Sequence, residues 1–138
     1  MSDLVSQNLN MIFKSPKGET VHALKDLNFT IKKGELLTVL GPSGCGKTTL
    51  LNIAAGFIRP TSGTITLGNN EINGPGVDRG MVFQQGALFE WLTVAENVNF
   101  GLRMKKEDPI KTQKKVDEWL EIVGCLLYTS PSPRDRYI

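Results

Sequence analysis

The sequence of 138 residues contains no long hydrophobic run and no strong excess of either charge. No apolar stretch approaches the roughly 18 residues that cross a membrane, and the polar residues 1–4 do not begin a signal peptide. Sixteen basic and fourteen acidic residues leave a net charge of +2, and no more than two basic residues are adjacent. This balance indicates neither a nucleic-acid partner nor an anionic membrane surface. We therefore expect one cytoplasmic domain that does not bind nucleic acid.

Cysteine and histidine are scarce, which argues against a metal centre built from them. Cys45 and Cys125 have no metal-binding spacing, and Cys45 lies in a glycine-rich loop where a structural disulfide is not expected. The single histidine, His22, falls in a strand-like segment, and we expect it on the surface of that strand.

The most informative segment that is present is a glycine-rich loop, residues 41–49. It follows the apolar run 36–40, precedes a helix-prone stretch and matches the pattern G-x-x-x-x-G-K-[ST] from Gly41 to Thr48. Glycines let backbone N–H groups point at a polyanion because no side chain blocks the approach. The alternative is a glycine-rich turn with an incidental lysine. Strict spacing in a strand–loop–helix context favours a loop that wraps the phosphates of ATP or GTP.

Each part of this loop has a chemical role in that interpretation. A helix that begins near Gly46 presents free amides and its positive dipole end to the phosphates. Lys47 supplies a positive charge for the β and γ phosphates, and the Thr48 hydroxyl is a ligand for Mg²⁺. The predicted nucleotide-binding residues are Gly41, Ser43, Gly44, Cys45, Gly46, Lys47, Thr48 and Thr49.

The segments around the loop predict both strands and helices. Strands are expected at 8–13, 21–31, 36–40, 64–67, 71–72 and 80–83, with a turn at 14–18 and a hairpin turn at 68–70. One helix should follow the loop and end at Gly56, and a capping box from Thr93 to Glu96 should begin a second. Asp108 followed by proline should begin a third helix, which Gly124 ends. We expect its apolar stripe, Val116, Trp119, Leu120 and Val123, to pack in a core.

With these residues in place, the chain resembles the ATP-binding subunit of an ABC transporter. Several separate segments carry the resemblance, which spans about residues 5–124: 23–31 with 34–35, 55–57, 63–65, 79–84 and 92–98. The resemblance implies an α/β fold, a P-loop NTPase of the ABC ATPase type with an N-terminal antiparallel β subdomain, of which only the N-terminal half is present. It also implies ATP and Mg²⁺ as cofactors.

The same resemblance assigns roles to two residues outside the loop. Gln84 matches the glutamine that touches Mg²⁺, takes part in catalysis and opens a segment in contact with membrane subunits; a neutral amide oxygen ligates a metal without adding negative charge beside triphosphate. The alternative is a glutamine that only closes a strand. Phe13 is the nearest match to the aromatic residue that stacks on adenine, although a core phenylalanine would fit the same position.

The segments 74–80 and 89–94 most resemble the importer branch for nitrate, sulfonate and taurine. Members of that branch commonly place proline before the tryptophan, where this chain has Glu90. The resemblance implies membrane-spanning permease subunits, a second ATP-binding subunit and, indirectly, a solute-binding protein as partners. It implies a peripheral location on the cytoplasmic face of the inner (plasma) membrane.

Parts of the family's hydrolysis machinery are not visible in the sequence. There is no segment like Leu-Ser-Gly-Gly-Gln, no apolar strand ending in Asp-Glu and no histidine after the loop; Asp117-Glu118 follows two lysines and a valine on an expected solvated helix. Residues 126–138 have neither helical nor strand periodicity, and we expect a non-native unstructured tail after a truncated domain at 1–125. The alternative is a genuine disordered Ser/Pro tail.

These absences make turnover by this chain alone doubtful. They also predict that the 36–40 strand is left without cover. Two other functions remain open, a nucleotide-binding module without turnover and a small P-loop kinase. A kinase needs a lid with arginines, whereas Arg59, Arg79 and Arg103 are scattered.

Overall fold

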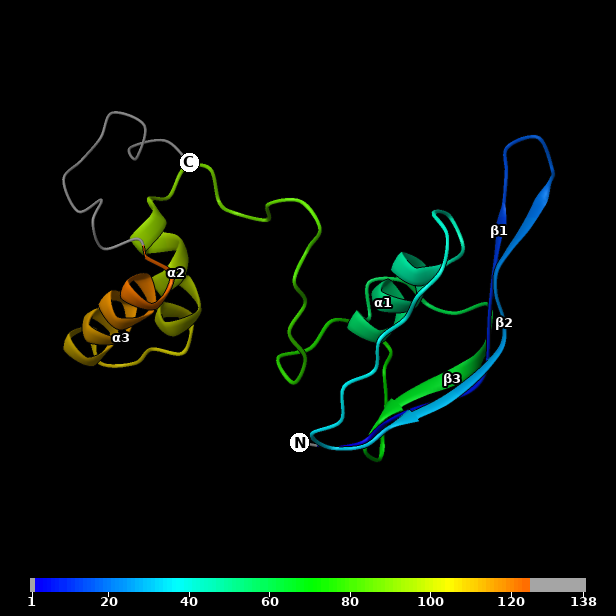
Figure 1. The fold of residues 1–138 in the computed structure, drawn as a ribbon, viewed down its shortest axis with the longest axis horizontal. Helices are drawn as coiled ribbons and strands as arrows, with labels where there is room; N and C mark the ends of the chain where they lie inside the picture. Colours follow the sequence, from blue (N-terminus) through cyan, green and yellow to red (C-terminus); the bar gives the residue numbers. More distant parts are fainter. Residues whose placement is uncertain (1, 125–138) are drawn as a thin grey trace. The chain divides into compact units, whose positions relative to one another are not determined.

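An antiparallel sheet of four strands forms the framework of the first part of the chain (Figure 1). The structure, a computed structural model, describes residues 2–124. Strands β1 (Leu4–Lys14), β2 (Thr20–Ile31), β3 (Ser62–Leu67) and β4 (Asn70–Glu71) lie in the order β2-β1-β3-β4. The predicted strands at 8–13 and 21–31 and the hairpin after residue 64 are therefore confirmed. His22 is exposed on β2, as expected.

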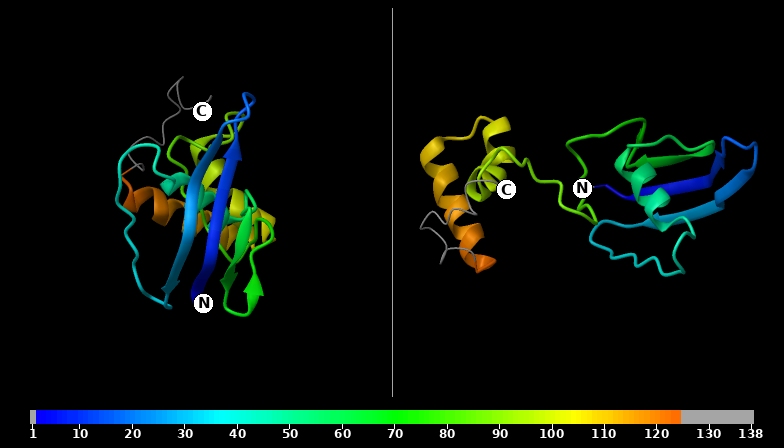
Figure 2. Two further views of the ribbon diagram at one scale, coloured as in Figure 1. Left: turned by 90° about the vertical axis from the view of Figure 1, so that its right-hand side faces the viewer. Right: turned by 90° about the horizontal axis from the view of Figure 1, so that it is seen from above.

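Helix α1 (Lys47–Ala55) packs against this sheet and follows the glycine-rich loop (Figure 2). Its Leu50 and Ile53 are buried together with Leu9 of β1 and Ile65 of β3. Side chains at positions i and i+3 of a helix share one face, so one short helix can cover the centre of the sheet. The helix ends at Gly56, whose φ of 83° is the left-handed conformation expected of a helix-ending glycine.

Two apolar segments differ from the sequence prediction. Strands were expected at 36–40 and 80–83, and both predictions are wrong because neither segment has strand structure. Leu36, Leu40 and Val82 are 89%, 87% and 95% exposed. A strand persists through hydrogen bonds to a neighbouring strand, and within residues 2–124 no strand pairs with either segment. The expected apolar exposure of 36–40 is confirmed.

The chain divides into two units, residues 1–82 and 83–138, and the second contains a pair of packed helices. Helices α2 (Val94–Met104) and α3 (Pro109–Ile122) begin at their predicted caps, Thr93 and Asp108. Of the predicted α3 stripe, Val116 is buried, but Trp119 and Val123 are 44% and 68% exposed. Within the described range, no helix has the length and apolar character that a membrane span needs. The predicted tail at 126–138 lies outside the described residues.

The capping box of α2 makes helix stability depend on pH. The backbone N–H of Thr93 donates to Oε2 of Glu96 (2.8 Å), and the N–H of Glu96 donates to Oγ1 of Thr93 (3.2 Å). Hydrogen bonds from the backbone and side chain of Thr93 hold the pKa of Glu96 below its ordinary value. A depressed pKa in the folded state means that the stabilisation is present above the unfolded-state pKa and is lost as the pH falls through the folded-state pKa.

We therefore expect acidification through the folded-state pKa of Glu96 to reduce the helicity of α2, measured by far-UV circular dichroism. Glu96→Gln is the matched variant, because glutamine at the same position completes a capping box but does not titrate. The variant should lose less helicity than the parent over the same acid range. Identical acid titrations of the two proteins would contradict the role of Glu96. Comparing the two also removes the contribution of Glu107, whose pKa is lowered by Lys115.

Candidate functional site

The N-terminus of α1 differs from those of the other two described helices because no side chain caps it. Thr93 and Asp108 cap α2 and α3, whereas Gly46 at the N-cap of α1 has no side chain and the first turn contains no acidic residue. The first helical hydrogen bond of this segment runs from the N–H of Leu50 to the carbonyl oxygen of Gly46 (2.9 Å). The preceding N–H groups and the positive end of the helix dipole are left for an anion from outside the helix.

The Lys47 side chain folds back over the loop that precedes this helix. Its Nζ donates to the carbonyl oxygens of Gly41 (2.7 Å) and Pro42 (2.6 Å) and contacts Sγ of Cys45 (3.4 Å). The ammonium group is therefore held at the loop that the sequence assigned to phosphates. Neutral carbonyl oxygens do not balance a full positive charge, so phosphate oxygens are stronger acceptors for the same donors.

Two glycines of the loop have a conformation that other residues rarely adopt. Gly44 and Gly46 have φ angles of 79° and 99°. A Cβ atom on Gly46 would lie 2.3 Å from the carbonyl oxygen of Ala23 in β2, so the loop enters the helix directly against the sheet. A Cβ on Gly41 would lie 2.6 Å from Sγ of Cys45. The motif spacing predicted glycine at positions 41 and 46. The structure adds the reason at position 46, because the carbonyl oxygen of Ala23 leaves no room for a Cβ atom there.

All the residues predicted for the loop are at least partly accessible from solvent. Gly41, Ser43, Gly44, Cys45 and Thr48 are exposed. Gly46, Lys47 and Thr49 are half-buried. A cluster of open amides, an uncapped helix and one ammonium group fits a triphosphate chemically. The exposed Thr48 hydroxyl fits the hard oxygen ligand that Mg²⁺ prefers.

The two predicted residues outside the loop lie on separate elements. Phe13 is near the end of β1, opposite Val21 of β2, and is 42% exposed, so its ring face is not fully used in the core. Gln84 is exposed in the second unit, whereas Thr48 belongs to the first. Their shared metal role stays a prediction. No cluster of three or more His, Cys, Asp or Glu side chains suited to a metal occurs in residues 2–124.

Pro42 is not among the predicted site residues, and proline has no N–H to offer a phosphate. The structure gives it a different part, since its carbonyl oxygen accepts the shortest hydrogen bond of the Lys47 ammonium group. Main-chain carbonyls are available at every position, so no residue-type signal marks this one. The close approach of Gly46 to Ala23 of β2 also arises only in the folded structure, so the sequence gives no signal for it.

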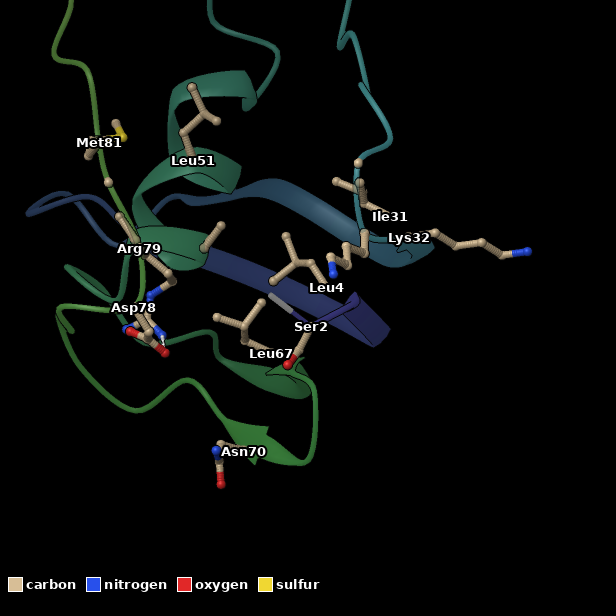
Figure 3. Close-up of a pocket in the computed structure, with 15 residues that line it drawn as sticks. Ser2, Leu4, Ile31, Lys32, Leu51, Leu67, Asn70, Asp78, Arg79 and Met81 are labelled. Carbon is tan, nitrogen blue, oxygen red and sulfur yellow. Dashed lines mark hydrogen bonds and ion pairs between the residues drawn. The ribbon is translucent and has the colours of Figure 1, made fainter.

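A pocket of about 630 Å³ also occurs in the first unit (Figure 3). It is lined by apolar side chains that include Leu4, Leu51 and Met81, and none of residues 41–49 contributes to it. Arg79 at its wall donates to Asp78 (3.1 Å) and to the carbonyl oxygen of Gly74 (2.6 Å), so two of its donor groups are already engaged. The pocket is therefore a weaker candidate for a polyanion than the glycine-rich loop.

Comparison with known proteins finds one family that covers most of the chain. A family model described as ABC transporter matches residues 24–134. Among solved structures, the dimeric post-hydrolysis state of the ATP-binding cassette MJ0796, bound to ADP and Pi, is 33% identical with a TM-score of 0.74. The match covers 86% of this chain and 56% of that structure. The predicted ABC ATPase fold is confirmed by this likeness.

Curated relatives include import ATP-binding proteins from several bacteria. The taurine import ATP-binding protein TauB of Pelagibacter ubique is 86% identical over 124 residues, covering 90% of this chain and 47% of the relative. The corresponding protein of Jannaschia is 55% identical with 90% and 46% coverage. The nitrate import ATP-binding protein NrtD of Synechocystis is 41% identical over 128 residues, with 93% and 48% coverage. The chain spans about half the length of these relatives.

Proposed function

Because the chain belongs to the ABC transporter family, we propose that it is the ATP-binding half of a subunit that couples ATP binding and hydrolysis to solute import. The observation that carries the proposal is the Lys47 ammonium group at an uncapped helix N-terminus. Backbone amides and one cation can bind the phosphates of a nucleotide, whatever solute is transported. The relatives named for taurine and nitrate import support the proposal that nucleotide binding serves solute transport.

We infer that the transported solute is an anion of the nitrate, sulfonate or taurine class. An 86% identical relative that is named for taurine import favours taurine within this class. The segments 74–80 and 89–94 support the same branch, although Glu90 stands where members commonly have proline.

In this proposal the loop residues bind and orient the nucleotide. Lys47 exchanges the carbonyl oxygens of Gly41 and Pro42 for β- and γ-phosphate oxygens, and loop amides donate to the same group. Thr48 and Gln84 would hold Mg²⁺, which would neutralise phosphate charge. Phe13 stacks on the adenine through its exposed ring face. Gln84 is also the catalytic residue of our proposal, because its side-chain amide oxygen would help to hold the metal.

The partners we propose are membrane-spanning permease subunits and a second ATP-binding subunit, with a solute-binding protein acting indirectly. The dimeric cassette among the similar structures supports the second copy. The location proposed is peripheral, on the cytoplasmic face of the membrane. We also propose residues 1–125 as the family domain and 126–138 as a non-native tail. By itself the chain is proposed to bind nucleotide without turnover, since the signature segment and the Asp-Glu strand are not in its sequence.

A chimera tests this function directly. Residues 1–124 of this chain would replace the matched half of the Pelagibacter relative, and ATP hydrolysis would be measured with and without Mg²⁺. The chimera should hydrolyse ATP, and Gln84→Ala should lower Mg²⁺-dependent turnover at least about tenfold with little change in ATP affinity. Gln85→Ala is the matched control, because it removes the neighbouring glutamine side chain.

Two outcomes would contradict the proposal. A folded chimera that binds no ATP would exclude the nucleotide-binding role. Equal losses of turnover in the Gln84 and Gln85 variants, or equal losses of ATP binding and turnover in the Gln84 variant, would argue against the metal role of Gln84.

A further inference from the structure

The side chain of Asn97 holds the turn that precedes α2. The backbone N–H of Phe89 donates to Oδ1 of Asn97 (2.8 Å). In return, Nδ2 of Asn97 donates to the carbonyl oxygens of Phe89 (3.1 Å), Leu92 (3.1 Å) and Thr93 (3.0 Å). One amide thus contacts both ends of the turn 89–93, and its two protons are shared by three acceptors.

The turn that Asn97 holds carries an aromatic cluster. The ring of Phe89 lies 4.4 Å from that of Phe100 and 5.3 Å from that of Trp91, measured between centroids, and both pairs are tilted. Phe100 comes from α2, so the cluster ties the turn to the helix. Trp91 is nevertheless 78% exposed, and only a small part of its indole is covered by neighbours. Burial therefore contributes little to its orientation, and the backbone of the turn sets where it lies.

From this geometry we propose that Asn97 is a positioning residue, whose amide fixes the turn 89–93 and thereby holds the exposed indole of Trp91 in one orientation. Asparagine is an unfavourable residue inside a helix, and its use in the first turn of α2 is explained by these four contacts outside the helix. The capping box of Thr93 and Glu96 adjoins the turn, so two sets of side-chain hydrogen bonds fix the entry to α2.

The same contact restricts the segment that contains Gln84. Only residues 85–88 separate Gln84 from Phe89, whose N–H and carbonyl oxygen Asn97 both engages. A short chain fixed at one end explores fewer conformations than a free one. This second consequence rests on the proposed function, because it matters only if Gln84 acts on bound nucleotide.

The first test uses the whole chain with Trp119→Phe, which leaves Trp91 as its single tryptophan. In that background, Asn97→Ala should lower the fluorescence anisotropy and the near-UV circular dichroism of Trp91, because the indole gains local freedom. Amide exchange at Phe89 should become about tenfold faster as its acceptor is lost. Far-UV helicity should be retained, since alanine is a better helix former than asparagine. This combination separates a positioning role from a general loss of folding.

Two further variants sharpen the result. Asn99→Ala is the matched control on the same helix, because the side-chain oxygen of Asn99 has no hydrogen-bond partner; it should leave the Trp91 signals unchanged. Asn97→Asp keeps the acceptor for Phe89 but loses the three donated bonds. The Phe89 amide should therefore stay protected at neutral pH while Trp91 becomes mobile. Protonation of that aspartate at acid pH restores a donor and should partly recover the Trp91 anisotropy, relative to the parent at the same pH.

Unchanged Trp91 anisotropy and Phe89 exchange in a folded Asn97→Ala variant would overturn the proposal. Equal effects of Asn99→Ala would do the same. In the ATP-hydrolysing chimera, Asn97→Ala should lower turnover at saturating ATP without weakening ATP binding, and unchanged turnover would reject the link to Gln84. A chimera without any ATPase activity would count against the proposed function and leave the spectroscopic result intact.

Discussion

Lys47→Ala should reduce the affinity of the chain for Mg-ATP by at least about 100-fold, because it removes the one lysine of residues 41–49 and the charge-assisted hydrogen bonds it would make to phosphate. In the structure, the Lys47 ammonium group donates to the carbonyl oxygens of Gly41 and Pro42. Isothermal titration calorimetry on the parent and the variant measures the loss. The control is Lys25→Ala, which makes the same change of charge on the exposed surface of β2.

The control protein should bind Mg-ATP as the parent does. Micromolar affinity retained after Lys47→Ala would refute the assignment of the phosphate site. A matching loss in the Lys25 variant would show that net charge, rather than the position of Lys47, controls binding.

Gly46→Ala should destabilise the first unit by about 3–5 kcal/mol, because a left-handed φ is combined with a collision against backbone. The added Cβ would lie 2.3 Å from the carbonyl oxygen of Ala23. This oxygen belongs to the backbone of β2, so rotating a side chain cannot relieve the contact. Urea unfolding followed by far-UV circular dichroism measures the change. Nucleotide binding should be lost as well, since the displaced loop no longer presents its amides together.

Gly44→Ala is the matched control within the same loop. Gly44 also has a positive φ, but a Cβ there meets nothing within 4 Å. Its cost should be close to the conformational strain alone, about 1 kcal/mol. If the two variants lose equal stability, the contact between the loop and β2 does not restrict residue 46.

Features set by local chemistry were predictable from the sequence. The Thr93–Glu96 capping box, the Asp108 cap and the end of α1 at Gly56 all depend on residues within one or two helical turns. The phosphate-loop residues follow from one spacing pattern for the same reason. The prediction of β2 succeeded because Leu27, Phe29 and Ile31 alternate with polar residues in the sequence, and the structure shows the matching alternation of burial.

Features that depend on distant partners were not predictable. The run 36–40 has the composition of a buried strand, but strand structure also requires a paired neighbour, and within residues 2–124 none is paired with it. The α3 stripe has helical periodicity, yet Val116 alone of its four residues is fully buried, because periodicity does not specify how much of a helix face is covered. The contacts of Gly46 with Ala23 and of Lys47 with Pro42 arise only in the folded loop.

A crystal structure of the chain with a non-hydrolysable Mg-ATP analogue tests the central claim most directly. Our account predicts phosphate density inside the 41–48 loop, with Nζ of Lys47 moved from the carbonyl oxygens of Gly41 and Pro42 to the phosphates and the Thr48 hydroxyl next to the metal. An analogue bound elsewhere, for example in the pocket beside Leu51 and Met81, while Lys47 keeps its present contacts, would contradict the account.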